Sequence, residues 1–200
     1  MKACGCQQAT RLRGIFIFIF QEVFPMNRKV RSLVLAAVCV ALGLVLPFLT
    51  GQIPSIGSKL SPMHIPVLLC GFLCGWQYGL AAGFVLPLLR NLLFGMPPMP
   101  VALIMAFEMA TYGLCTGLLY KFLPKKPAYV YVTLIASMLI GRVVWGVVSL
   151  IVYTARGTGF TFAAFLAGAF TNAVPGIILH IVLIPPIVLA LKKAKILREE

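Results

Sequence analysis

The chain has 200 residues, of which 61% are apolar and 10% charged, and its mean hydropathy is +1.03. This composition excludes an ordinary soluble domain, and the length gives room for about six membrane spans of roughly 20 residues. The 17 basic and 4 acidic residues give a formal net charge of +13, with the basic residues gathered at the ends of apolar runs. That placement argues against nucleic-acid binding and for a membrane protein oriented by its flanking charges.

The first 25 residues differ from the rest of the chain. Their apolar stretch, residues 14–20, is too short to span a bilayer and lacks a signal-peptide cleavage pattern. Residues 21–23 back-translate to a purine-rich sequence typical of a ribosome-binding site, just upstream of Met26. We therefore expect residues 1–25 to be a non-native or disordered extension, and residues 26–200 to form one membrane domain. N-terminal sequencing that began at Met1 would contradict this expectation.

The apolar runs predict six transmembrane helices joined by short loops. Proline and glycine mark the breaks between them, most clearly from Gly95 to Pro100. The sixth run contains Pro175-Gly176, and its first dozen residues are compatible with a separate loop or half-helix. The predicted fold class is an all-α integral membrane protein, a compact bundle of six transmembrane helices. These helices cover about residues 32–49, 63–76, 78–94, 101–120, 129–153 and 160–191.

The basic residues that flank these runs are unequally distributed between the two sides of the membrane. Only Lys59 and Arg156 fall on one side. By the positive-inside rule, the richer side is cytoplasmic, so both termini are predicted to be cytoplasmic. Ten residues make up that side: Arg28, Lys29, Arg31, Lys121, Lys125, Lys126, Lys192, Lys193, Lys195 and Arg198.

Small residues recur at helical spacing in several of the predicted spans. Glycines lie every fourth residue across the second and third spans, at Gly71, Gly75, Gly79 and Gly83. Such stripes let helix backbones approach closely, so we expect close packing inside the bundle. The first span has a comparable pair, Ala37 and Ala41, surrounded by Leu and Val. An apolar helix with one small stripe is suited to docking a partner protein.

Glu108 is the one acidic residue between Val23 and Arg198, and it lies inside a long apolar run. A carboxylate near the bilayer core costs roughly 3 kcal/mol or more unless it is paired or hydrated. An acid in this position therefore indicates a functional site by default. Two arginines, Arg90 and Arg142, also interrupt apolar sequence.

With both termini inside, the polar groups of four helices are predicted to share the outer half of the bilayer. The simpler interpretation of these charged residues is a buried Arg–Glu pair that only stabilises the helix bundle. However, one Glu cannot neutralise two arginines, and surplus positive charge suits an anionic or strongly polar ligand. His64 would lie at the mouth of this site, whereas His180 is treated as a packing residue. The predicted substrate-binding residues are His64, Arg90, Asn91, Glu108, Tyr112, Arg142, Trp145 and Asn172.

Motifs for catalysis or for nucleotide hydrolysis are not found. The sequence has no HExxH, no GxSxG and no GxxxxGK[ST] phosphate loop. Cys70 and Cys74 are one helical turn apart, but without a second nearby Cys or His pair we expect packing rather than metal binding. We therefore predict a protein that is not an enzyme, with no cofactor and no metal site.

Five motifs follow one another along the chain. They are Ala37-x-x-x-Ala41, Met63-His64-Ile65-Pro66-Val67 leading into Gly71-x-x-x-Gly75, Gly95-Met96-Pro97-Pro98, Phe107-Glu108-Met109-Ala110-Thr111-Tyr112-Gly113, and Pro175-Gly176-Ile177-Ile178-Leu179-His180. This ordered set resembles the substrate-binding (S) component of energy-coupling factor (ECF) vitamin transporters. The likeness covers about residues 28–195 and is closest to the group that includes pantothenate, folate and riboflavin binders, with pantothenate favoured.

The resemblance implies a division of labour. An S component binds a water-soluble vitamin in an outward-facing pocket of the bacterial plasma membrane. It then docks, here through Ala37 and Ala41, on a membrane coupling (T) subunit that two cytoplasmic ATPase subunits drive. The implied partners are thus a vitamin, these proteins and membrane lipid, and no nucleic acid. The alternative is a stand-alone secondary transporter of a small polar or anionic solute, with Glu108 as a proton carrier.

Overall fold

The computed structural model describes residues 27–49, 61–124, 126–157 and 174–193, together with Thr161, Phe165 and Gly168. All regular structure in these residues is helical, as predicted, and no strand occurs among them. The proposed extension, residues 1–25, lies outside the described residues. The helices are α2 (Arg28–Leu49), α4 (His64–Cys74), α5 (Trp76–Phe94), α6 (Val101–Phe122), α7 (Pro127–Ala155) and α9 (Val174–Lys193).

Four helices of the described residues are long and apolar enough to cross a membrane. They span Lys29–Phe48, Val101–Phe122, Pro127–Ala155 and Val174–Lys193. Helix α4 has 11 residues and is shorter than a bilayer requires, and α5 has 19 residues but is less apolar than these four. The structure therefore supports a helical membrane protein, while the count of six spans stays a prediction.

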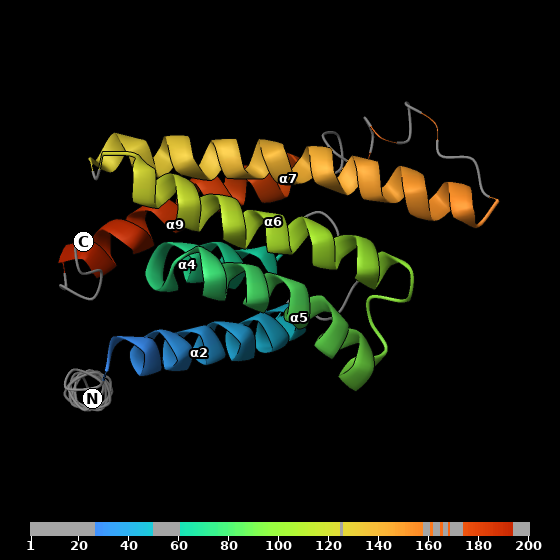
Figure 1. Cartoon of the computed structure of the whole chain (residues 1–200), viewed down its shortest axis with the longest axis horizontal. Helices are drawn as coiled ribbons and strands as arrows, with labels where there is room; N and C mark the ends of the chain where they lie inside the picture. Colours follow the sequence, from blue (N-terminus) through green and yellow to red (C-terminus); the bar gives the residue numbers. More distant parts are fainter. Residues whose placement is uncertain are drawn as a thin grey trace, which may run out of the picture.

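Helix α6 lies at the centre of the bundle. It packs against α4, α5 and α7, whereas α2 packs on α4 and α5 at one edge (Figure 1). Helix α9 packs on α7 and also reaches α4. A polar side chain on α6 can consequently meet residues from either half of the bundle.

The helix ends that carry the basic residues lie at one end of the molecule. Helices α2 and α7 begin there, and α6 and α9 end there, on the left of Figure 1. Arg156 follows the opposite end of α7. The charge asymmetry found in the sequence is thus an asymmetry of the folded body. The described basic residues of the charged end are Lys29, Arg31, Lys121, Lys126, Lys192 and Lys193.

Glycines bring the backbones of α5 and α6 into close approach. A Cβ atom at Gly79 would lie 2.6 Å from the carbonyl oxygen of Gly113, and one at Gly83 would overlap the backbone of Met109. The close packing predicted from the glycine repeat is confirmed at these positions. Gly75 behaves differently, because its φ of 88° places it in the left-handed region, where it separates α4 from α5.

We expect Gly79→Leu to destabilise the protein by about 1–3 kcal/mol or more, because this is the usual cost of overpacking a tight interface. The added side chain would meet the backbone of α6 rather than a flexible side chain. Thermal unfolding in detergent measures the effect. Ala81→Leu is the matched control, because Ala81 is exposed on the same helix. Equal melting temperatures for the two variants would contradict the packing account.

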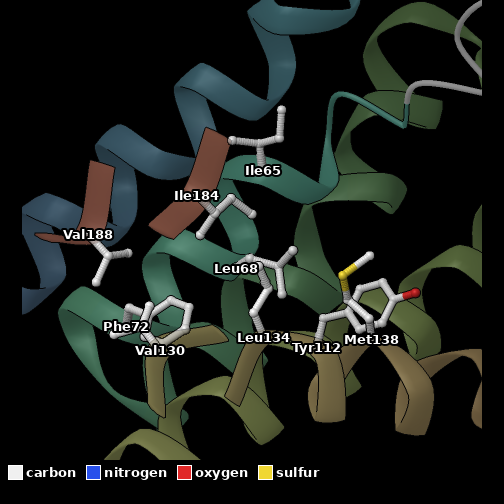
Figure 2. Close-up of a cluster of buried hydrophobic side chains, with 9 residues drawn as sticks. All are labelled: Ile65, Leu68, Phe72, Tyr112, Val130, Leu134, Met138, Ile184 and Val188. Atoms are coloured by element: carbon white, nitrogen blue, oxygen red, sulfur yellow. The ribbon is translucent and has the colours of Figure 1, made fainter. Parts of the chain in front are cut away.

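An apolar cluster of buried side chains joins α4, α6, α7 and α9. Figure 2 shows Tyr112 at the edge of this cluster, with its hydroxyl oxygen pointing away from the other eight side chains. The tyrosine ring is therefore held by apolar packing while its hydroxyl is free to serve a polar neighbour. The members of the cluster are Ile65, Leu68, Phe72, Tyr112, Val130, Leu134, Met138, Ile184 and Val188.

Candidate functional site

Helix α6 supplies the acidic residue at the centre of the candidate site. Glu108 is 2% exposed, and Tyr112 follows it by one helical turn on the same face. The Tyr112 hydroxyl donates a hydrogen bond of 2.8 Å to Oε1 of Glu108. The ring of Tyr112 also rests on α7, where Gly141 leaves room for it. The orientation of the Glu108 carboxylate is therefore fixed by packing as well as by hydrogen bonding.

Helix α7 supplies the counter-charge. Nη1 of Arg142 lies 3.0 Å from Oε1 of Glu108, the same oxygen that accepts from Tyr112. The Arg142 side chain is 11% exposed and that of Glu108 3%, so this ion pair is almost completely removed from solvent. The structure thus brings together three residues that the sequence predicted to share a site.

Helix α4 adds a histidine at its first residue. Nδ1 of His64 lies 3.2 Å from the carbonyl oxygen of Ser61, and Nε2 lies 3.8 Å from Oε1 of Glu108. The His64 ring also packs on the Tyr112 ring, with 5.3 Å between centroids. We call His64, Glu108, Tyr112 and Arg142 the Glu108 cluster. Its members come from α4, α6 and α7.

The Glu108 cluster is electrically balanced when His64 is neutral. One carboxylate faces one guanidinium, and the tyrosine hydroxyl adds a neutral hydrogen bond. Removing one partner of such a buried pair typically costs about 3–5 kcal/mol, because the remaining charge is left unpaired in a poorly solvated place. The same low-dielectric surroundings strengthen any hydrogen bond that a bound polar molecule makes there.

Arg90 does not form an ion pair with Glu108, contrary to the expectation of two arginines around one acid. Its Nη1 donates to the carbonyl oxygen of Leu44 at 2.9 Å, and its Cζ lies 5.4 Å from the Phe48 ring centroid and 5.7 Å from that of Phe94. Arg90 therefore ties α5 to the end of α2. The surplus positive charge inferred from the sequence is not present within the Glu108 cluster.

Two other predicted residues have contacts of their own outside the Glu108 cluster. Nδ2 of Asn91 donates to the carbonyl oxygen of Pro97 at 2.6 Å and so holds the turn between α5 and α6. Trp145, one turn beyond Arg142 on α7, stacks on Phe165 with 6.3 Å between centroids. Asn172 lies outside the described residues.

His180 of α9 is a neighbour that the sequence reasoning treated as packing. It is 2% exposed, and its ring centroid is 5.9 Å from that of His64. A four-residue stripe of buried positions, Gly176, His180, Ile184 and Val188, runs along α9. The sequence offers no comparable signal, because His180 is the one polar residue between Val174 and Leu191 and the apolar residues on all sides of it mark no face. No group of three metal-ligating side chains occurs within the described part of the chain.

In the described part of the chain, four long apolar helices and a buried Glu–Arg ion pair are typical of a membrane protein that handles a polar solute. Comparison with protein-family models gives a match over residues 31–188 to the family described as ECF transporter, substrate-specific component. The chain belongs to this family. Comparisons with curated proteins and with solved structures gave no significant match.

Membership of the family establishes the general role of the chain. It is a substrate-specific membrane subunit of a transporter, a class that binds substrates and works with a coupling module rather than catalysing a reaction. The resemblance found in the sequence motifs is thereby confirmed at the level of the family.

Proposed function

We propose that this protein binds a water-soluble vitamin, with pantothenate as the favoured ligand, and that the Glu108 cluster is the centre of its binding site. The observation that carries the proposal is the buried Glu108–Arg142 pair, whose atoms are 3.0 Å apart in a chain that belongs to a substrate-binding family. Ionic groups in apolar membrane helices cost free energy, and they usually occur along substrate pathways.

The remaining predicted residues take different parts in this proposal. Trp145 and Asn172 are further residues that contact the ligand in this proposal. Arg90 and Asn91 shape the site indirectly, through the hydrogen bonds that hold α2 and the turn after α5. Pantothenate provides hydroxyl, amide and carboxylate groups, which suit a site built from imidazole, carboxylate and guanidinium groups.

We further propose six spans in a bacterial plasma membrane, with both termini cytoplasmic. Support comes from the basic residues that gather at one end of the bundle. With that end inside, α6 begins at the outer side, and Glu108 is in its first half. The ligand then enters from outside the cell.

The surface of α2 supports docking on a coupling subunit. Ala37 and Ala41 are exposed, whereas Ala36 and Cys39 on another face of the helix are buried against the bundle. Small exposed residues allow a partner helix to approach closely within lipid. The partner in this proposal is the membrane T subunit, driven by two cytoplasmic ATPases, because the sequence contains no phosphate loop of its own.

Titration of the purified protein with pantothenate, followed by calorimetry, tests the function. We expect binding of about one molecule per chain at nanomolar concentration, and weaker binding of folate and riboflavin. Failure of all three vitamins to bind would contradict the proposal. Uptake by the chain alone in proteoliposomes, without ATP or partner proteins, would favour the secondary transporter with Glu108 as proton carrier.

A further inference from the structure

We propose that the Glu108 cluster binds a hydrogen-bond donor of the ligand, a hydroxyl or an amide N–H, through the Nε2 lone pair of His64, and that His180 contacts the same group. The carboxylate of an acidic ligand then lies outside the cluster. This inference rests on the proposed function, because it names the chemical group that the same site takes.

The hydrogen bond to Ser61 determines which His64 nitrogen carries the hydrogen. The Ser61 carbonyl oxygen is 3.0 Å from the backbone nitrogen of His64 and 3.2 Å from its Nδ1. A carbonyl oxygen only accepts, so Nδ1 must be the donor, and Nε2 of the neutral ring presents a lone pair. Ser61 has a φ of 45°, which is uncommon for a residue other than glycine. Such a conformation is often retained where backbone direction matters for binding.

The lone pair of His64 faces another acceptor. Nε2 and Oε1 of Glu108 are 3.8 Å apart, which is too long for a hydrogen bond. Nε2 is buried and has no hydrogen-bond partner within the described residues. A donor atom placed at about 2.9 Å from each of these two acceptors fits between them. A hydroxyl or an amide group of a ligand supplies such an atom, whereas a carboxylate would set a third acceptor against them.

Arg142 offers the complementary donor. Its Nη1 is engaged by Glu108, but its Nε is buried and has no hydrogen-bond partner within the described residues. The charged groups around His64 are therefore one carboxylate and one guanidinium, with the neutral Tyr112 and His180 beside them. A ligand group that both donates and accepts would satisfy His64 Nε2 and Arg142 Nε together.

His180 extends this arrangement from α9. Its ring is inclined by 30° to that of His64, and both of its nitrogens are buried without a hydrogen-bond partner among the described residues. The Ser61 carbonyl lies near the ring but outside hydrogen-bonding geometry. Buried polar atoms are normally paired, so two unpaired nitrogens at a candidate site point to a missing partner. A neutral imidazole donates from one nitrogen and accepts at the other, which suits a hydroxyl.

Two substitutions at His64 separate the roles of its ring nitrogens. The amide of His64→Gln reaches the Nε2 position and provides an acceptor there, whereas that of His64→Asn reaches only the Nδ1 position and can still donate to Ser61. We expect His64→Asn to weaken pantothenate binding roughly tenfold, the effect of one lost hydrogen bond, and His64→Gln to stay within about threefold of the wild type. His180→Phe should also weaken binding roughly tenfold, and His180→Gln less. Equal pantothenate affinities for the His64→Asn and His64→Gln variants would overturn the proposal.

Ligand analogues test the same inference on the unmodified protein, so that folding of the variants does not decide the result. Pantothenol, in which an alcohol replaces the carboxylate, should bind within about threefold of pantothenate, and an analogue with both pantoyl hydroxyls methylated should bind at least roughly tenfold more weakly. The reverse order would overturn the inference.

These experiments distinguish a failure of the proposed function from a failure of the donor contact alone. If pantothenate, folate and riboflavin all fail to bind the wild-type protein, the proposed function falls, and this inference falls with it. If one of the three binds, and the Asn and Gln variants at position 64 bind that vitamin equally, only the assignment of the donor contact is wrong.

Discussion

Arg142→Met is expected to weaken vitamin binding by about 100-fold or more. The substitution removes the guanidinium that lies 3.0 Å from Glu108 and the Nε donor that has no partner among the described residues. Truncating one member of a buried charge pair at a binding site costs about 2–5 kcal/mol, and every 1.4 kcal/mol is tenfold in affinity. Calorimetric titration measures the loss. Thermal unfolding of the same sample shows how much of it accompanies a loss of stability.

The double variant Glu108→Gln with Arg142→Met distinguishes a binding role of the ion pair from a purely structural one. Removing both charges leaves neither buried and unpaired, so this protein should be more stable than the single Arg142 variant. We expect it to remain unable to bind the vitamin, because the carboxylate and the guanidinium are both gone. If the pair only locked the bundle, the double variant would recover wild-type affinity. That recovery would show that the site assignment is wrong.

Ala37→Leu is expected to abolish vitamin uptake while leaving vitamin binding unchanged. Ala37 is exposed on α2, on the bundle edge farthest from α7 (Figure 1), and it has no role in the Glu108 cluster. A leucine there would keep a partner helix from approaching as closely as alanine allows. Uptake of radiolabelled vitamin is measured in proteoliposomes that also contain the T subunit and the two ATPases, and binding is measured on the isolated chain.

Ala190→Leu provides the matched control for the docking variant. Ala190 is exposed on α9, which packs on α7 and α4, whereas α2 packs on α4 and α5, and the substitution is chemically the same. We expect both binding and uptake to survive it. Uptake by the Ala37 variant at the control rate would exclude the docking role of α2.

The helices could be predicted from the sequence because apolar runs and helix breakers act locally. The run after Pro100 becomes α6 from Val101, and the last run contains α9 from Val174, beside the Pro175 that had suggested a divided segment. The length of α4 was harder to predict from the sequence. Its 11 residues end at Cys74, just before Gly75, whose left-handed backbone conformation depends on how the chain turns into α5.

The contact between Glu108 and Tyr112 was predictable for the same local reason. Residues four apart share a helix face, and both groups are polar in an apolar run. Their pairing with Arg142 could be predicted from the expected depth of each residue in the membrane. The partner of Arg90 did not follow, because it depends on how α5 rotates against α2. The structure turns this arginine to the Leu44 carbonyl and the rings of Phe48 and Phe94.

Mass spectrometry of the small molecules released from the freshly purified protein is the most direct test of the central claim, that a buried polar cluster in this bundle holds a vitamin. The account predicts about one vitamin molecule per chain in the wild type, and none in the folded Arg142→Met variant. A wild-type protein that releases no vitamin, or equal occupancy in the two proteins, would contradict it.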